Sequence, residues 1–164
     1  MCGIAGIVKR NIIRDKNIIN NMVESIKHRG PDGIGVYLFN NCALGHSRLS
    51  IVDLIGGKQP MLTPEGKIGI TFNGEIYGYK KIRQSLNYPF QSNSDTEVIL
   101  ALYKSNGIKL LDSLPGMFAF AIWDSARKKL FIARDRLGVK PLFYCVLADK
   151  LLFASELKSI LQFE

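Results

Sequence analysis

The strongest constraint on the fold is the arrangement of short apolar runs along the sequence. About eight runs of strand length are separated by turn residues, and the helical patterns fall between them in separate groups. A parallel doubly wound sheet needs a helix after nearly every strand. The sequence therefore predicts an α+β protein in which sheets pack on each other and helices lie outside.

The expected strands are 3–8, 36–39, 42–46, 68–72, 117–123, 130–133, 142–146 and 151–154, and the expected helices are 17–27, 79–86, 96–105, 108–114 and 156–161. The first helix follows from Ile18, Met22 and Ile26, which recur every four residues. Ser94 and Glu97 have the spacing of a capping box at the start of 96–105. Ser155 is the expected cap of the last helix.

Composition indicates one globular domain, residues 1–164, with 47% hydrophobic and 22% charged residues. No apolar run approaches the ~18 residues that a membrane span needs, and the N-terminus lacks a signal-peptide plan. We therefore expect a cytoplasmic protein without a membrane partner. Its three cysteines are odd in number and lack metal-ligand spacing, so neither a disulfide framework nor a metal site is expected.

A formal net charge of +8 raises the possibility of a nucleic-acid partner. The basic residues are spread out, as at 9–10, 80–81 and 127–129, and these runs do not alternate with aromatic residues. We therefore expect solvated basic faces and no nucleic-acid partner. A patch that meets an acidic protein or an anionic substrate is the alternative.

The N-terminal segment Met1-Cys2-Gly3 has the residues of a catalytic nucleophile. An initiator methionine before a small residue is normally removed, which would leave Cys2 with both a thiol and a free α-amine. An α-amine titrates at ~7.7–8.0 and a thiol at ~8.5, so one residue would supply a nucleophile and a base. The alternative is that Cys2 simply opens a buried strand, because cysteine is often buried.

An Asn-Gly pair follows the apolar run that ends at Phe72. Asn73 offers a side-chain donor and Gly74 an approachable backbone donor, and both suit the negative oxygen of a tetrahedral intermediate. The alternative is a type I′ hairpin turn. Residues 75–77 do not alternate as a returning strand would, which weakens that alternative.

Eight motifs occur in a specific order: Met-Cys-Gly-Ile-Ala-Gly at 1–6, His-Arg-Gly-Pro-Asp-Gly at 28–33, and then the segments 45–53, 59–61, 72–77, 94–97, 116–121 and 133–142. The ordered set closely resembles the glutaminase domain of class II glutamine amidotransferases, which are N-terminal nucleophile hydrolases, and in particular the asparagine synthetase branch. The resemblance spans essentially the whole chain. Each motif alone is weak, but their order is highly specific.

The resemblance implies a four-layer αββα sandwich that hydrolyses glutamine to glutamate and ammonia through a thioester on Cys2. Cys2 would be the nucleophile with its α-amine as base, and Asn73 and Gly74 would form the oxyanion hole. Arg48 would bind the substrate α-carboxylate, and Glu75 and Asp95 would hold its α-ammonium. The implied glutamine-binding residues are Arg48, Leu49, Ser50, Ile51, Val52, Asn73, Gly74, Glu75 and Asp95.

Several of these residues also allow structural interpretations. Arg48 suits a carboxylate because its planar fork can pair bidentately, but it could instead form a salt bridge to Asp53. Asp95 suits the first turn of a helix, where an acid complements the helix dipole. His28 and His46 are expected to make structural hydrogen bonds, since the α-amine already serves as base.

Two further segments are expected to support the site. Arg29 is expected to form a wall of the cysteine pocket, and residues 134–136 resemble a family marker expected to hold the scaffold by an internal ion pair. Family relatives usually carry a C-terminal synthetase domain that uses ATP and Mg, yet the sequence contains no Ser-Gly-Gly-x-Asp loop. We therefore expect a glutaminase domain alone, with no cofactor for its own step and a separate synthetase domain or subunit as partner.

The acceptor of the ammonia is not encoded in any motif of this chain. The alternative function is a catalytically silent or partner-dependent binding module with the same fold. A retained Met1 would produce that state by blocking the α-amine.

Overall fold

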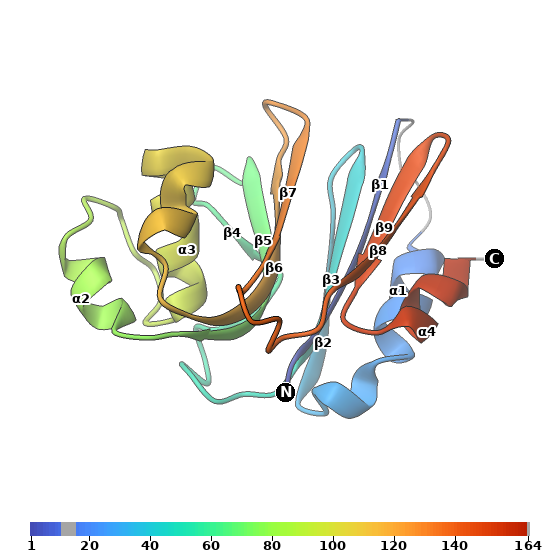
Figure 1. The fold of residues 1–164 in the computed structure, drawn as a ribbon, viewed down its shortest axis with the longest axis horizontal. Coiled ribbons are helices and arrows are strands. Elements are labelled where there is room, and N and C mark those ends of the chain that lie inside the picture. The colour runs from blue at the N-terminus through green and yellow to red at the C-terminus, as the bar shows by residue number, and fades with distance from the viewer. Residues whose placement is uncertain (11–15, 164) are drawn as a thin grey trace.

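The computed structural model describes residues 1–10 and 16–163, which form two facing antiparallel sheets with helices on both outer faces (Figure 1). One sheet has the strand order β2-β3-β1-β9-β8 and the other β4-β5-β6-β7. The strands are β1 (Gly3–Lys9), β2 (Gly33–Leu38), β3 (Cys42–Arg48), β4 (Met61–Leu62), β5 (Ile68–Ile76), β6 (Gly116–Asp124), β7 (Lys129–Arg134), β8 (Phe143–Leu147) and β9 (Lys150–Ala154). The predicted α+β class and its αββα layering are confirmed.

The helices cover the two outer faces of this sandwich. They are α1 (Asn17–Glu24), α2 (Tyr79–Gln84), α3 (Asp95–Asn106) and α4 (Leu157–Ile160), with 3-10 turns η1 (Lys27–Arg29), η2 (Gly107–Ser113) and η3 (Leu161–Phe163). Helices α1 and α4 lie on the sheet that contains β1, and α2 and α3 lie beside the sheet that contains β5 (Figure 1). No helix within the described residues is long and apolar enough to span a membrane.

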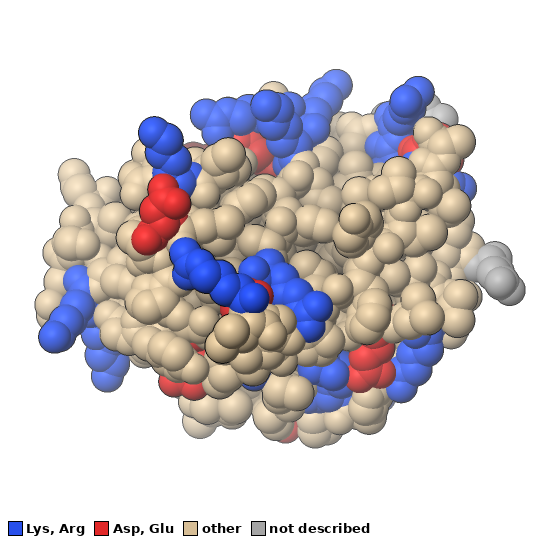
Figure 2. Space-filling view, viewed as in Figure 1, with Lys and Arg blue, Asp and Glu red and all other residues tan. Residues whose placement is uncertain are grey.

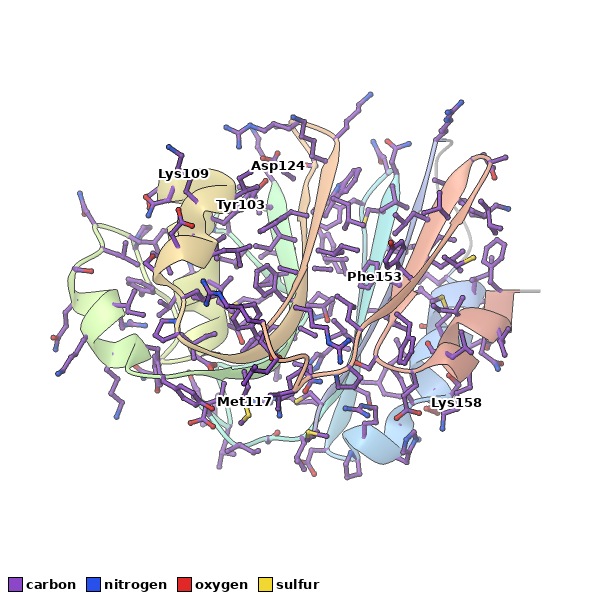
Figure 3. All side chains as sticks on the ribbon, in the orientation of Figure 1. Tyr103, Lys109, Met117, Asp124, Phe153 and Lys158 are labelled. Carbon is purple, nitrogen blue, oxygen red and sulfur yellow. The ribbon has the colours of Figure 1, made fainter. Side chains whose placement is uncertain are left out.

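Three apolar layers hold the sandwich together. The middle layer includes Ile4, Leu44 and Phe153, and Figure 3 shows Phe153 between the two sheets. Gly6 makes room for this layer, because a Cβ atom there would lie 2.2 Å from Cζ of Phe153. The Phe153 ring of the adjacent strand β9 can thereby lie close against β1, the strand that follows Cys2.

The predicted end of the strand at 68–72 is wrong. β5 continues past Phe72 to Ile76, so Asn73 and Gly74 lie within the strand and form no hairpin turn. The physical reason is β6, which pairs with β5 along its whole length, from Ile68 opposite Asp124 to Ile76 opposite Gly116. The local sequence around Phe72 contains no signal for pairing with a strand this far along the chain.

Two predicted helix starts need correction. Ser94 caps α3 by accepting a hydrogen bond from the Thr96 N–H at 3.2 Å, but Glu97 does not complete the capping box. Its carboxylate instead accepts hydrogen bonds from the N–H groups of Gln91 and Ser92 at 2.8 and 2.7 Å. Ser155 is not the cap of α4, because its hydroxyl accepts a hydrogen bond from the Ile4 N–H at 2.9 Å.

Smaller differences concern element lengths. α1 ends at Glu24, before the predicted 27, and the chain continues into η1. The predicted helix at 108–114 is the 3-10 turn η2, and the two-residue strand β4 was not predicted. On the face shown in Figure 2, the basic side chains lie in separate groups and form no continuous stripe.

Candidate active site

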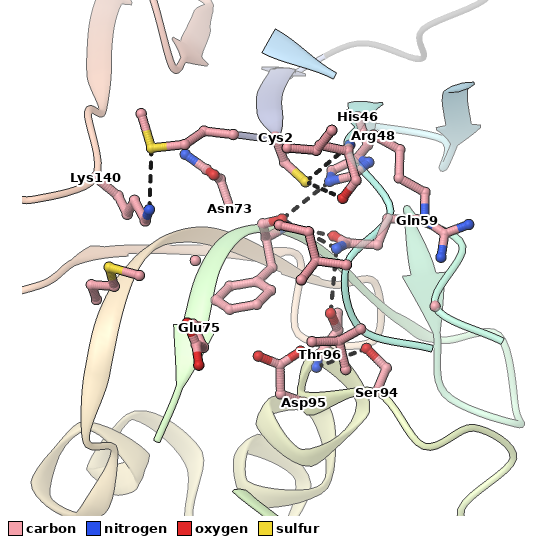
Figure 4. A pocket seen from close by; sticks show the side chains of 18 residues that line it. Cys2, His46, Arg48, Gln59, Asn73, Glu75, Ser94, Asp95, Thr96 and Lys140 are labelled. Carbon is pink, nitrogen blue, oxygen red and sulfur yellow. Dashed lines mark hydrogen bonds between the residues drawn. The ribbon is translucent and has the colours of Figure 1, made fainter. Parts of the chain in front are cut away.

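A pocket of about 170 Å³ lies where the N-terminal segment, β3, β5 and the start of α3 meet (Figure 4). This volume is below the ~300–1,000 Å³ typical of sites for drug-sized ligands, so it suits a small metabolite. Its lining residues are Met1, Cys2, His46, Arg48, Leu49, Ile51, Val52, Gly57, Gln59, Phe72, Asn73, Gly74, Glu75, Ser94, Asp95, Thr96, Met117 and Lys140. The pocket thus collects eight of the nine predicted glutamine-binding residues together with Cys2.

Ser50 is the exception among these predicted residues. It is not part of the pocket lining, and its N–H donates a hydrogen bond to Oδ2 of Asp32 at 2.7 Å. Its neighbours Leu49 and Ile51 do line the pocket. The contact with Asp32 ties the segment after β3 to the loop that precedes β2.

Cys2 lies half-buried immediately before β1, and its sulfur faces the pocket (Figure 4). Sγ lies 3.4 Å from both the N and the O atoms of Leu49, so the backbone just after β3 orients the sulfur. Arg29 fixes the other side of the residue by donating from Nε to the Cys2 carbonyl at 3.0 Å. Arg29 therefore holds the backbone of Cys2 and is not itself a pocket-lining residue.

Asn73 and Gly74 place two hydrogen-bond donors at this pocket. Nδ2 of Asn73 is buried and has no hydrogen-bond partner among the described residues. Phe72 and Ile76 both donate their N–H groups away from β6, to Gln59 and Asp95 respectively. Because alternate residues of a strand face the same edge, the N–H of Gly74 between them points to that edge too. A buried donor without a partner is costly, and this one is open to an acceptor that enters the pocket.

Arg48 closes one end of the pocket. Its guanidinium donates to the backbone carbonyls of Asp53 at 2.8 Å and Leu54 at 3.0 Å. The predicted alternative, a salt bridge to the Asp53 carboxylate, does not form, because that carboxylate accepts from the N–H groups of Gly56 and Asn93. These N–H groups, that of Asn93 foremost, hold the pKa of Asp53 below its usual range.

Asp95 and Glu75 bring negative charge to the side of the pocket away from Cys2 (Figure 4). Asp95 is only 3% exposed, and Oδ2 accepts a hydrogen bond from the Ile76 N–H at 3.1 Å. Burial raises the pKa of Asp95, and the neighbouring Glu75 charge adds to this rise. A cation bound between the two carboxylates would offset both effects.

Sequence reasoning assigned no site role to Gln59, Thr96 or Lys140, yet all three line the pocket. Gln59 belongs to a motif that carried the family resemblance, which was the available signal. Lys140 is 6% exposed, and its ammonium contacts the thioether sulfur of Met1 at 3.2 Å (Figure 4). The side chain of Met1 therefore occupies part of the pocket.

The segment around Asp135 shapes the loop that ends at Lys140. Asp135 accepts hydrogen bonds from the N–H groups of Phe118, Val139 and Lys140 at 3.2, 2.9 and 3.0 Å. Arg134 donates from Nε to the Lys140 carbonyl at 2.7 Å. The segment does scaffold the site, but it does so through backbone hydrogen bonds, and no ion pair joins 134–136 among the described residues.

Both histidines make the structural hydrogen bonds that were predicted. His28 pairs with Oε1 of Glu156 at 3.0 Å, outside the pocket. His46 is fully buried, and Nε2 lies 3.1 Å from the Phe72 carbonyl, which assigns the proton to Nε2. Burial lowers the pKa of His46 from 6.5 to about 4.

The low pKa of His46 makes stability depend on pH. Between pH 6.5 and 4 the unfolded chain binds a proton at His46 that the folded chain does not, so acidification lowers the free energy of unfolding. The expected loss approaches ~1.4 kcal/mol per pH unit and about 3 kcal/mol in total. Urea unfolding at several pH values measures this slope, and His46→Gln is expected to flatten it. Equal slopes in the two proteins would contradict the assignment.

Comparisons with known proteins agree with this geometry. A sequence model described as glutamine amidotransferase domain matches residues 1–164. Asparagine synthetase [glutamine-hydrolyzing] 2 of Bacillus subtilis is 44% identical over 98% of this chain and 22% of its own length. Asparagine synthetase B of Escherichia coli is 42% identical over 87% of this chain and 26% of its own length. The chain thus spans about a quarter of these curated relatives.

A solved structure shows the same fold. Glutamine phosphoribosylpyrophosphate amidotransferase from B. subtilis superposes with a TM-score of 0.82 at 23% identity, over 99% of this chain and 43% of its own. Taken with the match of the family model to the whole chain, the pocket that unites Cys2, Asn73 and Arg48 identifies the protein: the chain belongs to the glutamine amidotransferase domain family, and it resembles the N-terminal part of glutamine-hydrolysing asparagine synthetases.

Proposed function

We propose that Cys2, freed by removal of Met1, attacks the side-chain amide of glutamine in this pocket and releases ammonia. The observation that carries the proposal is the unpartnered Nδ2 of Asn73 in the pocket that also holds the Cys2 thiol. A buried donor of this kind forms its hydrogen bond only when a ligand brings an acceptor into the pocket. The oxygen of a tetrahedral intermediate formed on Cys2 is an acceptor of this kind.

Glutamine fits the charges of the pocket as a zwitterion. Its α-carboxylate would meet the guanidinium of Arg48, and its α-ammonium would lie between Glu75 and Asp95. Arg48 already donates to the carbonyls of Asp53 and Leu54, so its fork is held in place before substrate binds. A preorganised cation loses less entropy on binding a carboxylate. Leu49, Ile51 and Val52 line the remaining wall, and Ser50 supports it through Asp32.

The reaction needs one proton carrier, and the α-amine of Cys2 would serve. The amine accepts the thiol proton while Sγ bonds to the amide carbon, and the resulting oxyanion is held by Nδ2 of Asn73 and the N–H of Gly74. The proton then passes to the amide nitrogen, and ammonia leaves as the thioester forms. The free amine next accepts a proton from water, whose oxygen attacks the thioester. Glutamate leaves, and the thiolate recovers that proton.

The ammonia would serve amide formation of the asparagine synthetase kind. We propose that residues 1–164 act as one glutaminase domain for an ATP- and Mg-dependent synthetase domain or subunit, because the curated relatives are glutamine-hydrolysing asparagine synthetases about four times longer. The glutaminase step itself uses only side chains and backbone of this chain. Three free cysteines suit the reducing cytoplasm, where we place the protein.

The test is intact-mass spectrometry after incubation with 6-diazo-5-oxo-L-norleucine, a glutamine mimic that alkylates nucleophiles with loss of N₂. We expect loss of Met1 and one adduct on Cys2, and we expect excess L-glutamine to prevent the adduct. Cys42 and Cys145 serve as internal controls and stay unmodified. A processed Cys2 that stays unlabelled would contradict a competent glutamine site, and a retained Met1 would favour the silent binding module.

A further inference from the structure

Gln59 occupies an unusual place in the sheet. β4 pairs with β5 only through Met61 and Leu62, which lie opposite Ile70 and Gly69. Beyond Ile70 this edge of β5 therefore has no neighbouring strand among the described residues. The carboxamide of Gln59 takes the place of one: Oε1 accepts from the Phe72 N–H at 2.6 Å, and Nε2 donates to the Phe72 carbonyl at 3.1 Å. Donor and acceptor lie together in one plane, as in a peptide group.

The contacts of Gln59 continue on both sides of β5. Nε2 also donates to Oγ1 of Thr96 at 3.3 Å, in the first turn of α3. The backbone of Gln59 packs tightly on β2, since a Cβ atom on Gly35 would lie 1.9 Å from the Gln59 carbonyl oxygen. His46 adds a second donor to the Phe72 carbonyl. The backbone of Gln59 is thus fixed against β2, and its side chain is hydrogen-bonded to β5 (Figure 4).

Phe72, the residue that Gln59 binds, directly precedes the two proposed oxyanion donors Asn73 and Gly74. Gln59 holds Phe72, and Asp95 holds the Ile76 N–H on the same edge at 3.1 Å. The N–H of Gly74 lies midway between these anchors and stays directed at the pocket. A shift of the strand edge at Phe72 would turn both the Asn73 side chain and the Gly74 N–H. An ångström of misplacement at a reacting centre can lower a rate ~100-fold.

We infer that Gln59 is a positioning residue, which acts through Phe72 to keep the Asn73 amide and the Gly74 N–H aimed at the oxyanion; this inference rests on the proposed function. Donors of this kind act in the transition state, whereas Arg48 and Asp95 bind the ground state. Loss of the Gln59 carboxamide therefore lowers kcat and leaves KM nearly unchanged. A side chain that only stabilised the fold would change neither constant per folded molecule.

The experiment is a double-mutant cycle on glutamine hydrolysis by the processed chain. Gln59→Leu, of similar size but without polar atoms, is expected to lower kcat about 10- to 100-fold with KM within about threefold. In an Asn73→Ala background the same change is expected to lower kcat by a clearly smaller factor, at least about threefold less, because one of the two donors that Gln59 aligns is already absent. Rates are expressed per Cys2 that the diazo reagent labels at completion, which corrects for unfolded protein.

Two further variants complete the design. Gln59→Glu keeps the acceptor for the Phe72 N–H and loses the donor to its carbonyl, so we expect a drop in kcat even if Gln59→Leu fails to fold. Gln162→Leu is the matched control, and we expect wild-type constants. Gln162 is exposed on η3, outside the pocket lining, and its side chain donates to the Lys158 carbonyl at 3.2 Å.

Equal costs of Gln59→Leu in both backgrounds, or a change in KM alone, would overturn the inference and leave the proposed function standing. A wild-type chain that is processed but hydrolyses no glutamine would overturn the proposed function, and the inference with it.

Discussion

Cys2→Ala is expected to abolish ammonia release from glutamine, with a loss of at least about 10⁴-fold in kcat, while the chain stays folded. Removal of a catalytic nucleophile leaves only the residual effect of binding and the oxyanion hole. Alanine keeps the α-amine and the peptide backbone, including the carbonyl that Arg29 contacts. Folding should be little affected, because the hydrogen bonds of the thiol to described residues are two long ones, both with Leu49 at 3.4 Å.

The measurement is glutamate and ammonia release by the processed proteins, with urea unfolding as the check on folding. Cys145→Ala is the matched control, since Cys145 lies on β8 outside the pocket and should leave activity unchanged. If Cys2→Ala retained turnover above one per cent of wild type, another group would have to be the nucleophile.

Asn73→Ala is expected to lower kcat by about 10²–10³-fold with little change in KM, which is the typical cost of removing one oxyanion donor. Its effect on stability should be small, because Nδ2 of Asn73 has no hydrogen-bond partner among the described residues. Loss of activity without loss of stability is the signature of a donor preserved for the reaction.

Steady-state kinetics and urea unfolding of the same Asn73→Ala preparation measure both effects. Asn93→Ala is a suitable companion: Asn93 uses its backbone N–H to bind Asp53, so its side chain can be removed without losing that bond. An unchanged kcat in Asn73→Ala, or a change confined to KM, would return Asn73 to an ordinary strand position.

The local sequence predicted most of the elements because each leaves a short-range pattern. Ile19, Met22, Val23 and Ile26 repeat with helical spacing, and all four are fully buried. Strands β2 and β3, which Asn40 and Asn41 connect, overlap the expected strands 36–39 and 42–46. Local patterns failed where the hydrogen-bond partner came from a distant segment. The hydroxyl of Ser155 accepts from the Ile4 N–H and so does not cap α4. Pairing with β6 continues β5 beyond Phe72 to include Asn73.

The sequence by itself determined the chemical inventory: a cysteine at the N-terminus, an Asn-Gly pair, one arginine fork and two carboxylates, in an order typical of one family. These are residue types and their order, which local reading can recover. Only the tertiary structure decided their arrangement. β5 must pair with β6 before Gly74 can direct its N–H at the pocket, and Gln59 must reach across to Phe72 to hold it there. The contact of Gln59 with Phe72 spans 13 positions and that of Cys2 with Leu49 spans 47, and their geometry comes from packing of the whole sandwich.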